Sequence, residues 1–434
     1  MNKQTAVIIC NWNKKEDVLA CIDSVFRSNY KEFDLICVDN GSTDGSVKAI
    51  QSLRAPIHII SLQENVGGAG GFNAGLEYAM QGSYEYIVLL DNDVIVDETA
   101  IASLVSAMEL HDELGILGAK IYLAGTENHL QEFGSYIDWD NFNIKPLNQG
   151  AKDNNQLPSL LECDYVPACA LIVRSDAIRK VGMMDAQYFI YWDDIEWGYR
   201  MKQAGYRVMV TSQAKVWHKM GAAERKNTFA TYYFWRNRIH FFVNHISENS
   251  VEQFCEKLLN EILLALFFSQ YNKQQSLVFT IVNAIMDGLS VTRGQASTNK
   301  IFEREIKQDA LNVWLQQMNQ PLVSFVNCTS NTPDDVVASL LSRKYRDYSF
   351  VQHEKGCIYM VDHISEYTGP YCDDYVIVDK YFNVISSIEE FQHINDFKTW
   401  YNLSYRMYEP LLKLKIRNIK EKKTFDSWSW GEMK

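Results

Sequence analysis

The first hundred residues alternate short apolar runs with amphipathic segments, and a polar cluster follows every apolar run directly. The apolar runs, which we expect to be strands, are 6–10, 33–38, 57–60 and 86–90. The segments between them, typical of helices, are 13–26, the stretch ending near Leu53, and 70–80. Repeated strand and helix units of this length predict a mainly parallel sheet with right-handed crossovers. Such a sheet binds ligands in a crevice at the carboxyl ends of its strands.

The polar clusters should all lie at that crevice. In chain order they are Asn11 to Asn13, Asp39 to Asp44, Asn65 to Gly71 and Asp91 to Asp93. The glycines at 67, 68, 70 and 71 let the backbone approach a ligand closely and open a helix, whose amino end favours anions. The convergence of these clusters predicts a nucleotide site.

The pair Asp91 and Asp93 is the most informative of these clusters, because it directly follows the uninterrupted apolar run 86–90. Carboxylates at the end of a buried strand can hold a divalent cation against a diphosphate. Asp-x-Asp alone also fits a solvated turn, so the choice depends on the other clusters.

Asn13 with Glu16 three residues later predicts a capping box for the first helix.

Two nucleotide-binding classes and one class of partner are excluded. The turn after the first strand has no glycine, which excludes a Rossmann dinucleotide site, and no Gly-Lys-Ser or Gly-Lys-Thr occurs, which excludes a P-loop. A net charge of −12 excludes a duplex-binding protein, so we expect no nucleic acid partner. An acidic protein that handles phosphate usually recruits a metal ion.

A second acidic cluster and a histidine follow in residues 188–218. Asp193, Asp194 and Glu196 lie beside aromatic residues that include Trp192. A carboxyl group in such surroundings suits a general base, although acidic residues also favour a helix amino end, and both can be true. His218 follows Trp217 and is either structural or completes the coordination of an ion held by Asp91 and Asp93.

The combination of these motifs resembles the inverting glycosyltransferases of family 2 with the GT-A fold. The resemblance covers residues 5–240 and rests on 39–44, 65–68, 91–93, 192–196 and 216–218, in this order. Within the family, 67–72, 192–194, 198–200, 217–218 and 233–238 look most like bacterial galactofuranosyltransferases, and rhamnosyltransferases share much of this pattern. At Val166 to Cys169 the chain lacks the tryptophans that galactofuranosyltransferases often carry, which leaves the acceptor open.

The resemblance implies a role for each motif. Asp194 would be the catalytic base. Asp193, Glu196 and Trp192 would bind the acceptor, and Asp91, Asp93 and His218 would bind Mn²⁺ or Mg²⁺. The implied nucleotide-sugar ligands are Asn11, Asp39, Asn40, Asp44, Asn65, Gly67, Gly68, Asp91, Asn92 and Arg236. For Arg236, a structural link remains the alternative. The segment 124–158 is either an acceptor-side loop or a surface excursion.

The implied reaction transfers a sugar to a hydroxyl of a growing, lipid-linked cell-surface glycan. The implied donor is UDP-galactofuranose, with dTDP-rhamnose as the alternative. A nucleotidyltransferase and a non-catalytic binding scaffold are the other functions left open. The expected domains are a GT-A domain at 1–240, with a nucleotide-sugar half (1–100) and an acceptor half (101–240), and a helical or mixed α/β accessory domain at 241–434.

The last expectations concern location. The apolar run 6–10 is too short for a signal peptide, so we expect a cytoplasmic protein. The segment 411–423 is basic and amphipathic; it would either contact the inner face of the plasma membrane or pack on the protein or on a second subunit of a homo-oligomer. Helical patterns at 258–268 and 277–289 precede expected strands at 321–326 and 375–378, with a helix at 334–346 between them.

Overall fold

A computed structural model describes residues 4–126, 128–219, 227–305, 309–318, 320–330, 332–372 and 374–431, with the backbone alone at 366 and 423–431. The chain divides into two compact units, 1–248 with 282–303, and 249–281 with 304–434. The domain boundary expected at 240 stays a prediction. In the structure, residues 282–303 belong to the first unit.

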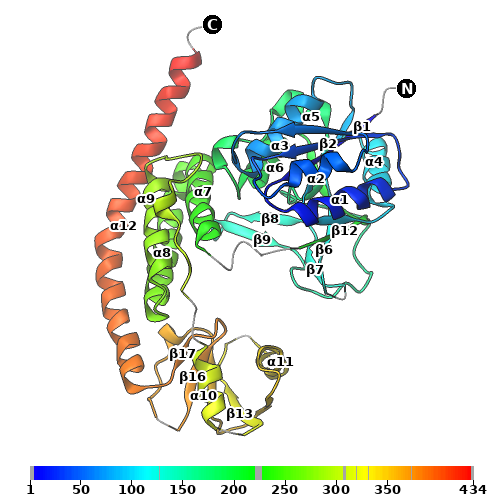
Figure 1. The fold of residues 1–434 in the computed structure, drawn as a ribbon. Helices are drawn as coiled ribbons and strands as arrows, with labels where there is room; N and C mark the ends of the chain where they lie inside the picture. Colours follow the sequence, from blue (N-terminus) through cyan, green and yellow to red (C-terminus); the bar gives the residue numbers. More distant parts are fainter. Residues whose placement is uncertain are drawn as a thin grey trace. The chain divides into compact units, whose positions relative to one another are not determined.

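The first unit is built on one large mixed sheet, which lies in the blue to green part of Figure 1. Four parallel neighbours form one half: β3 (Ile57–Ser61), β2 (Phe33–Asp39), β1 (Thr5–Asn11) and β4 (Tyr86–Asp91). The other half continues with β11 (Ala170–Arg174), β6 (Leu114–Leu123), β12 (Arg207–His218) and β10 (Leu160–Glu162). Two short strands lie off this path: β5 (Val94–Val96) pairs with β12, and β7 (Leu130–Glu132) pairs with β6. The prediction of a mainly parallel α/β fold is confirmed.

Helices cover both faces of this sheet because the strand residues alternate between two cores. Val7 and Ile9 of β1 belong to one core, with residues of α1 (Lys15–Arg27) and α4 (Ala100–Leu110). Ala6 and Ile8 belong to the other core, with residues of α3 (Gly67–Ala79), α5 (Ser175–Val181) and α6 (Asp193–Gln203). Further elements of this unit are α2 (Ser46–Ser52), β8 (Ser135–Asp138), β9 (Asn143–Pro146), η1 (Ala186–Tyr188), α7 (Phe229–His245), the end of α9 (Gln275–Leu289) and η3 (Thr298–Lys300).

The capping box expected at the start of α1 is wrong. Asn13 has φ +49°, and its Oδ1 accepts the Thr43 N–H at 2.7 Å instead of capping the helix. Asp44 accepts the Lys15 N–H at 2.9 Å and so supplies the acceptor for the helix start. The acceptor comes from the turn after β2, which the spacing within 13–16 could not reveal.

The second unit combines long helices with a small sheet. Its helices are α8 (Val251–Tyr271), the start of α9 (Gln275–Leu289), α10 (Ala310–Met318), α11 (Asp334–Lys344), η4 (Ile364–Glu366) and α12 (Ile388–Gly431). Its strands are β13 (Leu322–Asn327), β14 (Ser349–Gln352), β15 (Ile358–Val361), β16 (Val376–Asp379) and β17 (Val384–Ile385). They form a sheet in the order β14-β13-β15-β16-β17, parallel except for β17. The helices and strands expected in this region are present.

The basic segment 411–423 lies within α12, and the side chain of Lys423 lies outside the described residues. One face of it is buried through Leu412, Ile416 and Ile419, while Leu411 and Leu414 are more than half exposed. Packing within the protein therefore accounts for one face, and membrane contact through the other stays a prediction. Among the described residues, no helix combines the length and the apolar character needed to span a bilayer.

Candidate active site

The ends of three neighbouring strands are tied together by buried polar side chains. Asn11 Nδ2 donates to Asp39 Oδ1 at 3.1 Å, and Asn92 Nδ2 donates to Asn11 Oδ1 at 2.9 Å. The second oxygen of Asp39 accepts the Ser42 N–H at 2.9 Å. Asn11 and Asp39 are buried at the carboxyl ends of β1 and β2. The polar clusters after β1, β2 and β4 therefore meet at one edge, as the sequence predicts.

The turn after β3 is held by Asn40. Its Oδ1 accepts the Val66 N–H at 2.9 Å, while its Nδ2 donates to Gly67 O at 2.9 Å and to Asn65 Oδ1 at 3.1 Å. Gly67 has φ +85°, and a Cβ there would lie 2.1 Å from the carbonyl oxygen of Phe189. Only glycine fits this position, because both the backbone angle and the available space exclude a side chain. Gly68 follows in the first turn of α3.

Asp44 lies at the exposed end of the same group of turns. In addition to Lys15, its carboxylate accepts the N–H of Ser46 at 3.0 Å and the hydroxyl of that residue at 2.5 Å. Slight burial is outweighed by these hydrogen bonds, which lower the pKa of Asp44. Asp44 therefore orders the turn after β2, and its implied contact with a nucleotide stays a prediction.

His218 lies beside Asp91 and Asp93, although more than a hundred residues separate it from them in sequence. The Nε2 atom of His218 lies 3.1 Å from Asp93 Oδ1 and 3.8 Å from Asp91 Oδ2. β12 places His218 there, because its last residues pair with β5, which follows the two aspartates directly. His218 Nδ1 lies 2.7 Å from Gln131 Oε1, so that nitrogen carries the proton and Nε2 is left to face the carboxylates.

These residues fit a divalent metal ion. Burial opposes a charged imidazole, but Cys169, Asp93 and Asp91 outweigh it and raise the pKa of His218 to about 11. A position that attracts a proton so strongly also attracts a cation. Carboxylate oxygens with one imidazole suit Mn²⁺ or Mg²⁺, and the hydrogen bond from Nδ1 to Gln131 is the kind that orients metal-binding histidines.

Two further residues lie at this cluster. Cys169 Sγ, Asp91 and His218 offer ligand atoms within 4.8 Å of one another. Burial raises the pKa of Cys169 to about 11, and sulfur is a soft ligand that suits these hard ions less well than oxygen. Lys14 Nζ lies 2.7 Å from Asp93 Oδ2. The candidate metal ligands are therefore the carboxylate oxygens of Asp91 and Asp93 and the imidazole of His218, which the sequence predicts.

The second acidic cluster occupies the amino end of α6. Burial, with Asp194 as the next cause, raises the pKa of Asp193 to about 7; burial and Glu132 raise the pKa of Asp194 to about 7. Asp194 accepts the N–H of Ala168 at 3.4 Å and that of Ile195 at 2.8 Å. Burial raises the pKa of Asp91 to about 6 and the charge of Asp193 adds to this, so the two acidic clusters lie within electrostatic reach of each other. The helix-terminus interpretation holds, because the acidic residues lie in the first turn of α6, and the role of Asp194 as base stays a prediction.

Two residues with an implied acceptor role make contacts within the protein. The Trp192 side chain is 1% exposed and packs against Phe234, Phe241 and Phe242. Both carboxylate oxygens of Glu196 accept the Arg200 Nε–H, at 2.7 and 2.8 Å. These contacts explain packing and helix stability, and an acceptor contact stays a prediction for both residues.

The geometry of Arg236 supports the structural alternative. Its guanidinium is buried and donates to Asn237 Oδ1 at 2.9 Å, Gly294 O at 2.7 Å and Tyr188 O at 3.1 Å. All three nitrogens are engaged by protein oxygens, which argues against contact with a phosphate.

Sequence reasoning missed Gln131 and Glu132 as members of the site. Both lie in β7, inside the segment 124–158, and are buried. One oxygen of Glu132 has no hydrogen-bond partner within the described part of the chain, and burial raises the pKa of Glu132 to about 7. A strand of three residues gives no periodic signal, so only the aromatic and polar composition of the segment pointed to an acceptor side.

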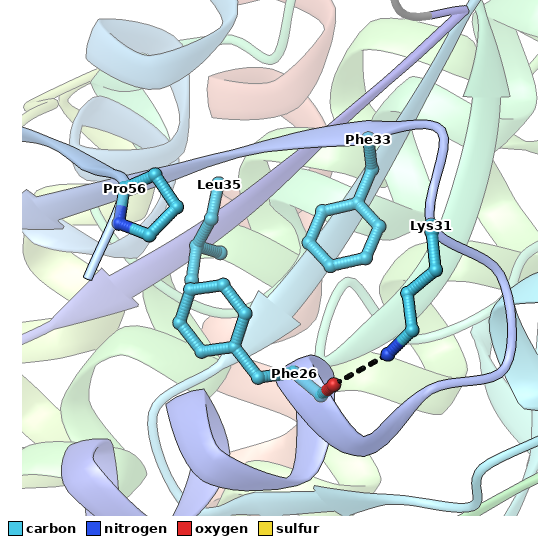
Figure 2. Close-up of a pocket in the computed structure, with 5 residues that line it drawn as sticks. All are labelled: Phe26, Lys31, Phe33, Leu35 and Pro56. Carbon is cyan, nitrogen blue, oxygen red and sulfur yellow. Dashed lines mark hydrogen bonds between the residues drawn. The ribbon is translucent and has the colours of Figure 1, made fainter.

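A cavity of about 170 Å³ lies elsewhere, near the start of β2 (Figure 2). It is lined by Phe26, Lys31, Phe33, Leu35 and Pro56, and Lys31 Nζ donates to Phe26 O at 2.8 Å. Its lining contains none of the predicted site residues, so it does not compete with the crevice as the functional site.

Residues 6–179 match the family model described as glycosyl transferase family 2. Over 183 residues the chain is 30% identical to a teichoic acid poly(glycerol phosphate) polymerase of Staphylococcus epidermidis, covering 41% of this chain and 24% of that protein. It is also 22% identical over 226 residues to a poly-beta-1,6-N-acetyl-D-glucosamine synthase of Staphylococcus aureus, covering 49% of each. The chain thus spans a quarter to a half of these two relatives.

Solved structures give weaker likenesses. A structure of GalNAc-T7 with UDP, GalNAc and Mn²⁺ aligns at a TM-score of 0.47 and 12% identity, covering 59% of this chain and 51% of that one. Residues 1–349 of Staphylococcus aureus TarS align at a TM-score of 0.43 and 13% identity, covering 66% and 80%. The matched family segment includes Asp91 and Asp93 and ends before Asp194 and His218. Residues 6–179 of this chain are thus similar to glycosyl transferase family 2 domains, and the first unit that contains them is built on a mixed α/β sheet.

Proposed function

We propose that the chain is a metal-dependent inverting glycosyltransferase that uses a nucleotide sugar. One observation carries the proposal: a cation-attracting cluster, Asp91, Asp93 and His218, lies within electrostatic reach of a buried acid pair, Asp193 and Asp194. One cluster suits a diphosphate leaving group, and the other suits an attacking hydroxyl. An enzyme that transfers a sugar by a single displacement needs one group of residues at the leaving group and another at the attacking hydroxyl.

Each cluster has its own part in the reaction. Asp194 would take the proton of an acceptor hydroxyl, since its raised pKa of about 7 makes it a base near neutral pH. Asp93 and His218 would hold the metal ion, with Asp91 shared between the metal and the ribose. When bound, the ion would neutralise charge on the diphosphate. Attack from the side opposite the leaving group inverts the anomeric centre, and one base suffices, unlike the carboxyl pair of glycosidases.

For the donor we propose UDP-galactofuranose, with dTDP-rhamnose as the second candidate. The basis is the likeness of segments 67–72, 192–194 and 233–238 to galactofuranosyltransferases. Asp39, Asn40 and the turn 65–68 would contact the nucleotide, because they lie at the carboxyl ends of β1 to β4, beside Asp91. A nucleotidyltransferase would instead release pyrophosphate from a nucleoside triphosphate.

For the acceptor we propose a hydroxyl of a growing, lipid-linked surface glycan. The names of the two relatives, a teichoic acid polymerase and a polysaccharide synthase, support this class. The reaction would then take place at the cytoplasmic side of the plasma membrane. Peripheral contact through 411–423 and association with a second copy belong to the same proposal.

The decisive experiment measures nucleotide-sugar binding and its dependence on metal. Purified protein is heated with UDP-galactofuranose, UDP-galactopyranose, UDP-glucose or dTDP-rhamnose, each with and without Mn²⁺. A donor present at about 100 times its Kd should stabilise the fold by about 2.7 kcal/mol. We expect protection that requires Mn²⁺ and is greatest with UDP-galactofuranose.

Two variants make this test specific. Asp93→Ala should abolish the Mn²⁺-dependent protection, whereas Asp97→Ala should keep it, because Asp97 bonds Thr99 outside the crevice. If no donor protects the wild-type protein, or if protection is the same without metal, the proposed function is wrong. Greater protection by dTDP-rhamnose would move the donor to the second candidate.

A further inference from the structure

The segment that leads into α6 has an unusual backbone. Phe189, Tyr191 and Trp192 have φ of +69°, +61° and +69°, in the left-handed region that bulky residues rarely adopt. Trp192 is also the residue before Asp193 and Asp194, so this segment determines where both carboxyl groups lie. Such a conformation persists only where its surroundings hold it in place.

Asn237 of α7 holds this segment from one side. Its Nδ2 lies 2.9 Å from Tyr188 O, 2.8 Å from Ile190 O and 2.9 Å from Tyr191 O. Its Oδ1 accepts the Arg236 Nε–H, so the amide fits in one orientation only. Asn237 is 2% exposed, and a buried amide contributes most where both ends are bonded.

The glycine turn 65–71, which we call the donor turn after its proposed role, contacts the same segment. The Gly67 Cα packs so closely on Phe189 that a Cβ would overlap the Phe189 carbonyl, and the Ala69 N–H lies 3.4 Å from that oxygen. The ring of Phe189 stacks on Tyr233, with centroids 5.1 Å apart. Residues 188–192 therefore contact both the donor turn and α7.

We propose that Asn237 is a positioning residue that fixes the distance between the donor turn and the base on α6. This proposal rests on the proposed function in one respect, the assignment of Asp194 as base. Asn237 touches neither substrate. It acts through the three carbonyl groups, whose position sets the start of α6.

The residue type at 237 follows from this role. The segment presents three acceptors and no donor to residue 237, so the side chain there must donate. Asn237→Asp keeps the shape and replaces the donor by a carboxylate, which three carbonyl oxygens repel. Asn237→Ser keeps one shorter donor and disturbs the fold less.

The matched control is Asn244→Asp, the same chemical change two turns along α7. Asn244 Nδ2 contacts His240 Nε2 at 3.0 Å, within its own helix. We expect wild-type behaviour from this variant. Asp194→Asn serves as the reference for the base itself.

Two measurements test the proposal. Hydrogen exchange of peptides from 186–198, without any substrate, should be faster in Asn237→Asp than in the control. With donor, acceptor and Mn²⁺, kcat should fall by about 100-fold, as expected for an ångström-scale misplacement, while KM for the donor changes by less than about threefold. Asn237→Ser should show the same pattern more weakly.

The outcomes separate three conclusions. Wild-type exchange or wild-type kcat in both Asn237 variants overturns the positioning role. Exchange that rises across the whole first unit, with a lower melting temperature and a raised KM, also overturns it and indicates general stabilisation. If Asp194→Asn keeps full transfer, the proposed base is wrong, and the exchange of 186–198 still decides whether Asn237 holds the segment.

Discussion

The two sheets of the molecule place acidic residues at equivalent positions and treat them differently. In the C-terminal sheet, Asp362 follows β15 and accepts the N–H and the hydroxyl of Ser330, at 2.7 and 2.6 Å. These bonds lower its pKa. Asp379 ends β16, is fully buried, and accepts the N–H groups of Ile364, Tyr381 and Asn383. Each of these acids is satisfied by donors from its own unit.

In the N-terminal unit four acids, Asp91, Glu132, Asp193 and Asp194, have few hydrogen-bond donors, whereas Asp93 pairs with His218 and Lys14. Burial raises the pKa of Asp91, Asp193 and Asp194, and one oxygen of Glu132 has no partner in the described part of the chain. Asp91 ends β4 as Asp379 ends β16, so residue type and place in the sheet do not by themselves predict activity. The two units differ in the number of hydrogen-bond donors that their acids receive. Acids whose oxygens are hydrogen-bonded stabilise a fold, whereas acids without such partners are left to bind an ion or a proton.

The largest expected effect comes from removing one acid from each unit. Asp194→Asn should lower kcat about 10²- to 10⁴-fold, because a general base contributes that much, while Asp362→Asn should leave kcat unchanged. Steady-state transfer assays on both variants measure this. Thermal unfolding should show that Asp194→Asn remains folded. Equal losses in the two variants would contradict the distinction between the sheets.

A smaller effect is expected from Gln131→Ala, which removes the partner of His218 Nδ1. The apparent affinity for Mn²⁺ should fall about 10- to 100-fold, since such partners orient metal-binding imidazoles. Saturating Mn²⁺ should restore kcat. Titration of Mn²⁺ in the transfer assay measures this, with Gln213→Ala, an exposed site on β12, as the control. An unchanged titration would show that Gln131 does not orient His218.

The pH dependence should also distinguish the two regions. Asp194, with a pKa of about 7, is protonated at lower pH and cannot accept a proton, so kcat should fall about tenfold per pH unit below that value. Glu132→Gln should move this acid limb to lower pH, because the charge of Glu132 raises the pKa of Asp194. A profile of kcat from about pH 5 to 9 tests both statements. A flat profile would exclude a base that titrates near neutrality.

The smallest effect on activity is expected from Asp379→Ala in the C-terminal sheet. It leaves three backbone N–H groups without their acceptor, which should lower the free energy of unfolding of that unit by about 1–3 kcal/mol or more. At temperatures where the variant is folded, kcat should match the wild type. Urea unfolding and transfer assays on the same samples compare the two quantities. A loss of kcat without a loss of stability would give Asp379 a functional part.

Much of the first unit could be predicted from sequence, because its strands are continuous apolar runs. Parallel strands bring their carboxyl ends together, so the meeting of Asp91 with Asp39 and Asn11 follows from pattern alone. β12 is harder to predict, because it reaches His218 through an irregular register between Thr211 and Lys215.

Other contacts could not be predicted because no local pattern encodes them. Gln131 and Glu132 reach the site from a strand of three residues, and the acceptor for the start of α1 comes from Asp44, in another turn. The contacts of Asn237 depend on three non-glycine residues with positive φ, which the sequence around 189–192 does not announce.

The contact of Gly67 with Phe189 has a practical consequence for changing the specificity of this protein. A library that varies only the donor turn, 65–71, would also displace the segment that carries the acid pair, because no space separates them. Variants selected for a new donor would then lose turnover for steric reasons unrelated to recognition. Redesign therefore has to treat 65–71 and 188–192 as one unit of variation, and homologous replacements should be exchanged as a pair.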